Sequence, residues 1–334
     1  MSGPTLADIA RAAEVSTATV SHALNGTGRL TDSTRRRVRE VATTLGYGSQ
    51  RTPRTANTLG VAVTTYGGSA WNFLEVPYFA RLLTVATATA HAHGYALTIL
   101  PTTCGAETPW HTLTVDGMLL LDSPTDDPVL RALRARGIPL VFDGRPVDPQ
   151  PGDVWVDNDH TATTREVLAH LAASGARRIA LQAGYGDEHY TQAVTRAYEQ
   201  WCHEHGRTPL FFTFDPNDTS GHGFDADFTA RTCDAVYTVY DPGGRQVLAA
   251  AARHGLRIPD DLRLVCVSED PAYAETDPPV STVTLNPATI AETAMTALVS
   301  RLSPTAPPPP GALTVPAVLH PRRSSRSQTP PGSM

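Results

Sequence analysis

The chain has no lysine, and all 27 of its Lys and Arg residues are arginines. The lysine-containing phosphate loop G-x-x-x-x-G-K-[ST] is therefore absent, and every permanently positive side chain is suited to bidentate phosphate contact. The sequence also has no amino-terminal apolar signal segment and no apolar run near the roughly 20 residues that span a bilayer. We therefore expect no membrane partner and a cytoplasmic location.

Cysteine is scarce. The four thiols are widely spaced and form no C-x-x-C pair; they are Cys104, Cys202, Cys233 and Cys266. This spacing excludes a disulfide framework and a cysteine-based zinc site, and it predicts reduced, mostly buried thiols.

Catalytic motifs are missing as well, since neither H-E-x-x-H nor a strand-turn-helix G-x-S-x-G is present. The histidine pairs at 91 and 93 and at 203 and 205 are two residues apart on predicted helices, so their rings point in well-separated directions. The stretch DNDH at 157–160 is interpreted as a helix-capping loop, and HGFDAD at 222–227 as a polar surface turn. We expect no enzyme activity, no metal and no cofactor.

The amino-terminal segment contains clear helix signals. Thr5 and Asp8 form the pattern of a capping box, which satisfies unpaired amides of the first turn. One apolar face then follows at helical spacing, made by Leu6, Ile9, Ala10 and Ala13. This pattern predicts a first helix that ends before Glu14.

Two more helices are predicted after a short turn. Ser16 is an N-cap for the second helix, which Asn25-Gly26 ends, and Thr31 caps a third helix that Gly46 closes. The apolar positions that pack these helices are Val20, Leu24, Val38, Val41, Ala42 and Leu45. Two short helices joined by a turn of three or four residues make a helix-turn-helix.

The outward face of the second helix is small and polar. It carries Thr17, Ala18, Ser21 and His22, which fit a major groove about 12 Å wide and can offer hydrogen bonds. The alternative is an ordinary helical bundle whose polar face is solvated. Charge favours DNA, because residues 1–54 hold eight arginines and four acids in a chain of net charge −6. A basic head on an acidic body is typical of phosphate binding at one end.

The stretch TLADIARAAEVSTATVSHALNG followed by RLTDSTRRRVREVATTLGY resembles, without a gap, the head of the LacI/galactose-repressor family of transcription regulators. The resemblance implies that Thr17, Ala18 and His22 read bases or groove edges. It implies further DNA contacts, most of them to phosphate, at Thr5, Leu6, Ser16, Thr19, Ser21, Asn25, Arg29, Thr31 and Thr34. The family usually has arginine at position 22 and glycine at position 14, so we expect an altered operator preference and a cost of about 1 kcal/mol if Glu14 is left-handed.

Residues 51–57 are predicted to be a linker between a DNA-binding domain, residues 1–50, and the rest of the chain. In the family this connection is longer and holds a hinge helix that opens the minor groove, whereas here it is short, contains Pro53 and has no leucine. Arg51 and Arg54 are candidates for contacts with phosphates or a narrow minor groove.

Residues 58–325 alternate between apolar strands and helices, which predicts parallel sheets with right-handed crossovers. The segments ARRIALQAG, GLRIPDDLRLVCVSED and DPPVSTVTLNP resemble the family's two-lobed, periplasmic-binding-protein-like sensor. The predicted fold is thus an all-α helix-turn-helix head plus a two-lobed α/β domain. We expect a first lobe from about 58–158 and 285–303, a second from about 159–284 and 312–325 whose last strand lies in ALTVPAVLHPRRS, and a disordered tail at 326–334. A first-lobe helix is expected to be reduced between Thr102 and Val115.

The family binds its effector between the lobes. By position, the residues implied for this role are Trp71, Tyr78, Phe79, Asp122, Tyr198, Tyr240, Asp241, Ser268 and Glu269. Aromatic faces with a few polar groups suit a sugar ring, although the same aromatics could simply pack the junction. The family's Asp-Asn pair matches either Asp157-Asn158 or Asp159-His160.

Several family positions in this site are substituted. Val194 stands where the family has an arginine, Tyr240 where it has an asparagine, and Ser268 where it has an aspartate. We therefore expect common sugars and purines to leave DNA affinity unchanged, and any effector to be more apolar or aromatic.

The sequence as a whole predicts a DNA-binding regulator, more specifically a repressor. We expect it to bind a pseudo-palindromic double-stranded operator as a homodimer, and the sequence is also compatible with a tetramer. Its partner in the sensor is an unknown small-molecule effector. One alternative is a DNA binder that needs no effector and whose lobes serve only dimerisation. The other is a solute-binding protein, which would have no use for a basic helix-turn-helix.

Overall fold

A computed structural model describes residues 5–25, 28, 30–44, 56–63, 73–101, 113–184, 186–216, 218, 220–303, 305–307 and 309–326. The chain divides into two compact units, Met1–Thr55 and Ala56–Met334. Each unit is described by itself. The predicted linker up to residue 55, the tail after Arg326 and most of the segment expected to be reduced near residue 102 lie outside the described residues.

The first unit contains α1 (Leu6–Ala12), α2 (Thr17–Asn25) and α3 (Asp32–Thr44). The predicted capping box is confirmed, because the Thr5 hydroxyl accepts from the Asp8 amide while the Asp8 carboxylate accepts from the Thr5 amide. The predicted caps of α2 and α3 are also present, with Ser16 Oγ 3.1 Å from the Thr19 amide and Thr31 Oγ1 3.3 Å from the Thr34 amide. These caps satisfy backbone donors that a helix cannot satisfy itself.

The core of the head is small and closed. Ile9 of α1, Val20 of α2 and Val38 of α3 are each 0% exposed and pack together. The turn between α1 and α2 places Glu14 at a φ of 50°, in the left-handed region that disfavours a side chain. The turn geometry therefore matches the strain expected at this position.

The first sheet of the second unit has the order β11-β5-β4-β3-β1-β2. Its strands are β1 (Thr58–Val63), β2 (Ala96–Pro101), β3 (Gly117–Leu121), β4 (Leu140–Asp143), β5 (Trp155–Asp157) and β11 (Ala312–Thr314). All the pairings are parallel, as the strand and helix alternation predicted. We call this sheet and its helices lobe 1.

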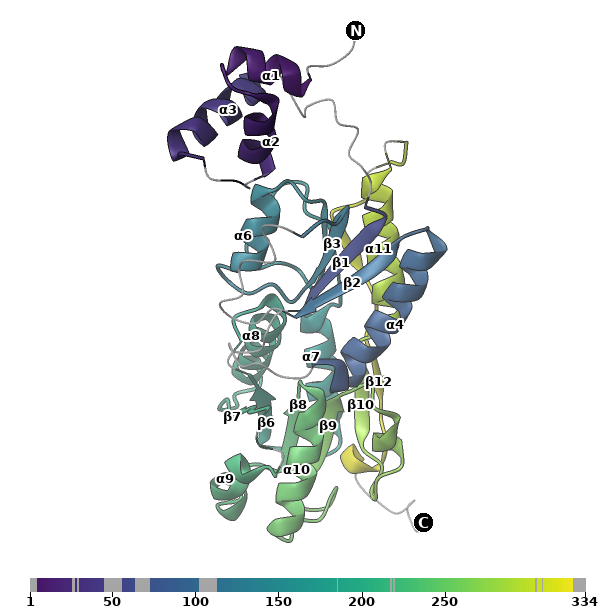
Figure 1. Cartoon of the computed structure of the whole chain (residues 1–334). Helices are drawn as coiled ribbons and strands as arrows, with labels where there is room; N and C mark the ends of the chain where they lie inside the picture. Colours follow the sequence, from purple (N-terminus) through teal and green to yellow (C-terminus); the bar gives the residue numbers. More distant parts are fainter. Residues whose placement is uncertain are drawn as a thin grey trace, which may run out of the picture. The chain divides into compact units, whose positions relative to one another are not determined.

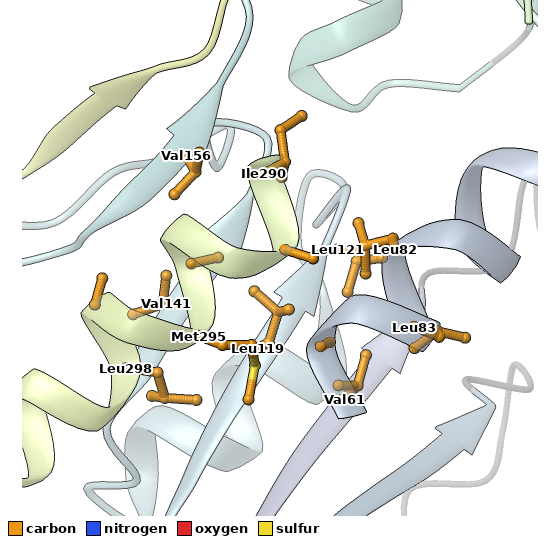
Figure 2. Close-up of a cluster of buried hydrophobic side chains, with 14 of the residues drawn as sticks. Val61, Leu82, Leu83, Leu119, Leu121, Val141, Val156, Ile290, Met295 and Leu298 are labelled. Atoms are coloured by element: carbon orange, nitrogen blue, oxygen red, sulfur yellow. The ribbon is translucent and has the colours of Figure 1, made fainter. Parts of the chain in front are cut away.

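Alternating strand residues of lobe 1 bury opposite faces of the sheet. On one face α4 (Pro77–Ala92) and α11 (Pro287–Leu302) lie side by side (Figure 1). Figure 2 shows Leu82 of α4 beside Leu121 of β3, and Met295 of α11 beside Leu119 of the same strand. On the other face α6 (Pro128–Ala135) packs against Met118, Leu120 and Phe142. The short η2 (Phe73–Glu75) precedes α4.

The second sheet has the order β12-β10-β9-β8-β6-β7, and we call it and its helices lobe 2. Its strands are β6 (Ile179–Ala183), β7 (Phe211–Thr213), β8 (Ala235–Thr238), β9 (Arg263–Val267), β10 (Ser281–Thr284) and the antiparallel β12 (Val318–His320). Helices α7 (His160–Ala173) and α8 (His189–Glu204) cover one face, and α9 (Asp225–Thr229) and α10 (Asp241–Arg253) cover the other. The single turns η3 (His222–Phe224), η4 (Pro271–Ala274) and η5 (Arg323–Ser325) complete the lobe.

Within the described residues the chain passes between the lobes after β5, after β10 and after β11. The last passage corrects a prediction. The segment ALTVPAVLHPRRS was expected to form one strand of the second lobe, but β11 pairs with β5 in lobe 1 and only β12 pairs with β10 in lobe 2. Pro316 lies between the two strands and has no amide hydrogen to continue a ladder.

Three of the four cysteines are described, and Cys202, Cys233 and Cys266 are buried free thiols, as expected. Cys104 lies outside the described residues. Among the described helices, none is long and apolar enough to cross a membrane.

Candidate nucleic-acid interface and inter-lobe site

Helix α2 separates a buried side from an exposed one. Val20 and Ala23 are 0% exposed in the core of the head, whereas Thr17, Ala18 and His22 are exposed. Ser21 is half-buried beside them. The three residues predicted to read bases therefore share the solvent face of one short helix.

The residues predicted to contact phosphate are found mainly at helix starts. Thr5, Ser16 and Thr31 are exposed caps, and Leu6 is 37% exposed. The cap hydroxyls also form hydrogen bonds with neighbouring hydroxyls: Ser16 Oγ lies 2.9 Å from Thr19 Oγ1, and Thr31 Oγ1 lies 2.8 Å from Thr34 Oγ1. Helix starts are favourable anion sites because their amides and dipole face outward.

Four predicted DNA contacts lie wholly or partly outside the described residues. Arg29, Arg51 and Arg54 lie outside the described residues, and for Asn25 only the backbone is described. Their roles stay predictions.

The predicted effector residues gather at the carboxyl ends of parallel strands. In lobe 1, the predicted Asp122 follows β3, and Asp157 of the possible Asp-Asn pair ends β5. Asp143, which was not predicted, ends β4 beside them. In lobe 2, Tyr240 and Asp241 follow β8, and the last of the set, Ser268 and Glu269, follow β9. Ligands of open α/β sheets bind at this edge, where crossovers to opposite sides leave a crevice.

Asp143 and Tyr78 form a hydrogen-bonded pair at this edge of lobe 1. The Tyr78 hydroxyl lies 3.1 Å and 3.0 Å from the two oxygens of Asp143, which is 5% exposed. Burial raises the pKa of Asp143 to about 7, although the hydrogen bond from Tyr78 opposes this. Burial, followed by the charge of Asp143, raises the pKa of Tyr78 well above its usual value. Phe79 packs edge-on against Tyr78, with ring centres 5.3 Å apart.

Asp122 adds a second perturbed carboxyl. Its φ of 45° is left-handed, and its Oδ1 lies 2.9 Å from where a Cβ at Gly144 would stand. Burial raises the pKa of Asp122 well above its usual value, and the nearby carboxylates of Asp143, Glu188 and Asp157 raise it further. Glu188 belongs to lobe 2, so like charges face one another across the lobes.

Asp157 links the lobes through histidine. Its carboxylate lies 2.7 Å from Nε2 of His160 and 3.6 Å from Nδ1 of His189, both in lobe 2. Burial by itself raises the pKa of Asp157, but the hydrogen bond with His160 and the nearby His189 outweigh it and hold the pKa well below the usual value. Asp157 is therefore a charged hydrogen-bond acceptor that is largely shielded from solvent.

Tyr240 is the centre of an aromatic and acidic group in lobe 2. Its hydroxyl donates to Glu188 at 2.9 Å and contacts the Thr191 hydroxyl. Its ring stacks on Phe214 at 4.9 Å and meets Tyr190 edge-on at 5.8 Å. A tyrosine with one stacked face and a bonded hydroxyl has a fixed orientation.

The remaining predicted residues of lobe 2 have structural partners. The Ser268 hydroxyl donates to Asp241, whose pKa burial raises to about 6. Glu269 accepts from the Thr284 hydroxyl at 2.7 Å and from the Leu285 amide at 2.9 Å. Glu269 thus fixes the backbone where the chain leaves β10 of lobe 2 and enters lobe 1.

Tyr198 does not join the others. It is 0% exposed in the core beneath α8, and its hydroxyl donates to the carbonyl oxygen of Ile179 at 2.7 Å. The predicted effector role of Tyr198 is therefore unsupported by its position. Trp71 lies outside the described residues.

His160, which one match of the family's Asp-Asn pair included, begins α7 at this edge. Four residues of the site were missed by the sequence reasoning. Asp143 ends β4, and Glu188, His189 and Tyr190 stand at the start of α8. A helix start that directly follows a parallel strand was the signal that could have identified the last three.

Among the described residues, no group of three or more His, Cys, Asp or Glu side chains could hold a metal ion. In the stretch at 222–227, Asp225 instead pairs with His222 at 2.9 Å, Arg253 at 2.7 Å and His254 at 2.8 Å. Phe224 is buried beside them. This turn is a salt-bridged surface structure.

Two family models match the chain. Residues 5–50 match "Bacterial regulatory proteins, lacI family", and residues 168–325 match "Periplasmic binding protein-like domain". The chain is 28% identical over 305 residues to the HTH-type transcriptional regulator CelR of Thermobifida fusca, covering 84% of this chain and 86% of that one. It is 26% identical to the HTH-type transcriptional repressor PurR of Aliivibrio fischeri (strain ATCC 700601 / ES114), covering 89% and 91%.

Solved structures share the fold. A transcriptional regulator CelR-cellobiose complex matches with a TM-score of 0.70 and 24% identity over 96% of this chain and 99% of that one. The lac repressor dimer bound to operator and the anti-inducer ONPF matches with a TM-score of 0.71 and 20% identity over 98% and 100%.

Proposed function

Because this chain is a bacterial transcription regulator of the lacI family, we propose that it represses genes by inserting α2 into the major groove of a pseudo-palindromic operator. The observation that carries this proposal is the solvent face of α2, where Thr17, Ala18 and His22 are exposed opposite a fully buried side. Small side chains let the helix enter the groove, and the imidazole can reach a base edge.

We propose that the chain acts as a homodimer. One head supplies one recognition helix, and a two-fold operator with half-sites about one helical turn apart requires two. The similarity to a lac repressor dimer bound to operator supports this arrangement. Arg51 and Arg54 are proposed to contact phosphates or the minor groove beside each half-site.

The effector is proposed to bind where the strands of both lobes end. Asp122, Asp143 and Glu188 offer acceptors there, and Tyr240 with Phe214 offers a stacked aromatic surface. The charges that act on the pKa of Asp122 and Asp143 come from other carboxylates, so an anion is disfavoured. The substituted positions alone favour an apolar effector, whereas these acceptors favour an uncharged ring with several hydroxyl donors, such as a saccharide.

The DNA-binding proposal is tested by selection from a randomised duplex library with the full-length chain. We expect an enriched inverted repeat that the Thr17→Ala/His22→Ala variant no longer selects, while a Thr84→Ala variant, altered on the exposed side of α4, still does. Enrichment of no sequence, or of the same repeat by all three proteins, would reject recognition by α2.

The effector proposal is tested by thermal shift with cellobiose and maltose against glucose 6-phosphate and adenosine monophosphate. We expect a neutral sugar to raise the melting temperature and to weaken binding to the selected duplex, and the anions to do neither. If no compound shifts the melting temperature, the effector-independent alternative is favoured.

A further inference from the structure

Arg35 of α3 turns toward α2. Its Nη1 lies 3.4 Å from the carbonyl oxygen of His22, and its Nη2 lies 2.7 Å from the carbonyl oxygen of Gly28. The His22 carbonyl is in the last turn of α2, where carbonyls lack helical partners and a cation is stabilising. The guanidinium therefore joins the end of α2 to the loop before α3.

Gly28 lies directly on the side chain of His22. A Cβ at position 28 would stand 2.9 Å from Cγ of the imidazole, which is closer than real Cβ contacts, and 3.1 Å from its Nδ1, which is tighter than most of them. Gly28 also has a φ of 71°, which other residues rarely adopt. The loop backbone thus occupies one side of the imidazole of an exposed residue.

We propose that Arg35 and Gly28 fix the orientation of the His22 imidazole and so determine which base pair α2 selects. Arg35 is a positioning residue, because its guanidinium donates to the carbonyl oxygens of His22 and Gly28 and so holds Gly28 against the ring. Arg36, the next residue, is exposed on α3 and is the matched comparison. The inference rests on the proposed operator recognition and adds how its reading residue is held.

The two roles for an arginine predict different salt behaviour. An arginine that neutralises a phosphate changes the slope of log K against log salt by about one unit and affects all sequences equally. A positioning arginine changes the preference among sequences and leaves the slope nearly unchanged. Discrimination at one base pair is therefore the property to measure.

The experiment uses the full-length chain, the duplex that the wild type selects from a randomised library, and the same duplex changed at the base pair that His22 specifies. Dissociation constants are measured over a salt series for wild type, Arg35→Gln, Gly28→Ala and Arg36→Gln. We expect Arg35→Gln and Gly28→Ala each to reduce the discrimination ratio about tenfold. Their salt slopes should change by less than about half a unit, while Arg36→Gln keeps the ratio.

The His22→Ala background separates positioning from damage to the head. Once the imidazole is absent, Arg35→Gln and Gly28→Ala should produce no further change in the ratio, because coupled residues are not additive. Circular dichroism melting of each variant reports whether the head is folded. An equal loss of the ratio in the His22→Ala background, or uniform weakening with a flattened slope for Arg35→Gln, would overturn the inference. If the wild type selects no sequence, the proposed function fails first and this inference fails with it.

Discussion

The side-chain amide of Asn158 donates to the carbonyl oxygen of Val315 at 2.8 Å, although 157 residues separate the two in the chain. The same amide lies 3.1 Å from the carbonyl oxygen of Leu285. Asn158 follows β5, Leu285 follows β10 and Val315 follows β11, so one buried amide ties together all the described passages between the lobes. A change in the angle between the lobes must bend the chain at this point.

We expect Asn158→Ala to lower the free energy of unfolding by about 2 kcal/mol, because it leaves the carbonyls of the buried Val315 and the partly buried Leu285 without their donor. Urea denaturation followed by circular dichroism measures the change. The control is Thr84→Ala on the exposed side of α4, which should stay within about 0.5 kcal/mol of wild type. An Asn158→Ala protein as stable as wild type would show that water replaces the amide.

Asp143 predicts a pH dependence of stability. Its folded pKa is about 7, above an unfolded value of about 4, so its contribution is fully present below about pH 4 and is lost as pH rises to about 7. This pKa shift corresponds to about 4 kcal/mol of free energy of unfolding. The urea midpoint of the wild type should fall between pH 5 and pH 8, and Asp143→Asn should reduce this fall. Asp126→Asn, on an exposed loop, should show the same fall as the wild type; equal dependence on pH in both variants would contradict the role of Asp143.

Tyr198 and Tyr240 should separate stability from ligand binding. Tyr198→Phe removes a buried hydroxyl bonded to Ile179 and Leu210, and should cost about 1 to 2 kcal/mol without altering effector affinity. Tyr240→Phe removes the hydroxyl that donates to Glu188, and it should lower the affinity for the effector more than it lowers the free energy of unfolding. Calorimetric titration with a sugar hit from the thermal-shift panel distinguishes them, and the reverse pattern would restore Tyr198 to the site.

Glu14→Gly should stabilise the head by a few tenths to about 1 kcal/mol. Glycine removes the strain of the left-handed conformation, and the higher conformational entropy of glycine in the unfolded chain offsets only part of this gain. Hydrogen exchange of the head amides in the full chain measures it. Glu40→Gly is the matched variant, in the exposed interior of α3, and should destabilise by about 1 kcal/mol. Two losses of similar size would mean that the turn is not strained.

His22→Ala should lose about 1 to 3 kcal/mol of discrimination at one base pair in each half-site. Dissociation constants for the selected duplex and a random duplex test this. Equal weakening on both duplexes would refute base reading by His22.

The helix caps of the head were predictable because they act over three residues. Thr5, Ser16 and Thr31 bond within their own turn, so the sequence contains both partners of each bond. The split of ALTVPAVLHPRRS between two sheets was not predictable, because the partners of β11 and β12 lie far away in β5 and β10.

The inter-lobe site shows the same limit. Asp122 and Asp157 at strand ends were identified because buried strands are easy to recognise, whereas Glu188 and His189 are polar residues before the apolar face of α8, and only the helix start marks them. Tyr198 was misplaced because an aromatic near a site and an aromatic in a core look alike, although its spacing with Val194 and Trp201 marks the buried side of α8.

The repeated passage of the chain between the lobes has a consequence for synthesis. Lobe 1 begins at β1, yet Ile290, Ala294 and Leu298 of α11 belong to its core, and β11 completes its sheet. A growing chain on the ribosome therefore carries an uncovered apolar sheet until nearly all of it has emerged. Any message truncated before α11 encodes a protein with the exposed surface that chaperones and proteases recognise.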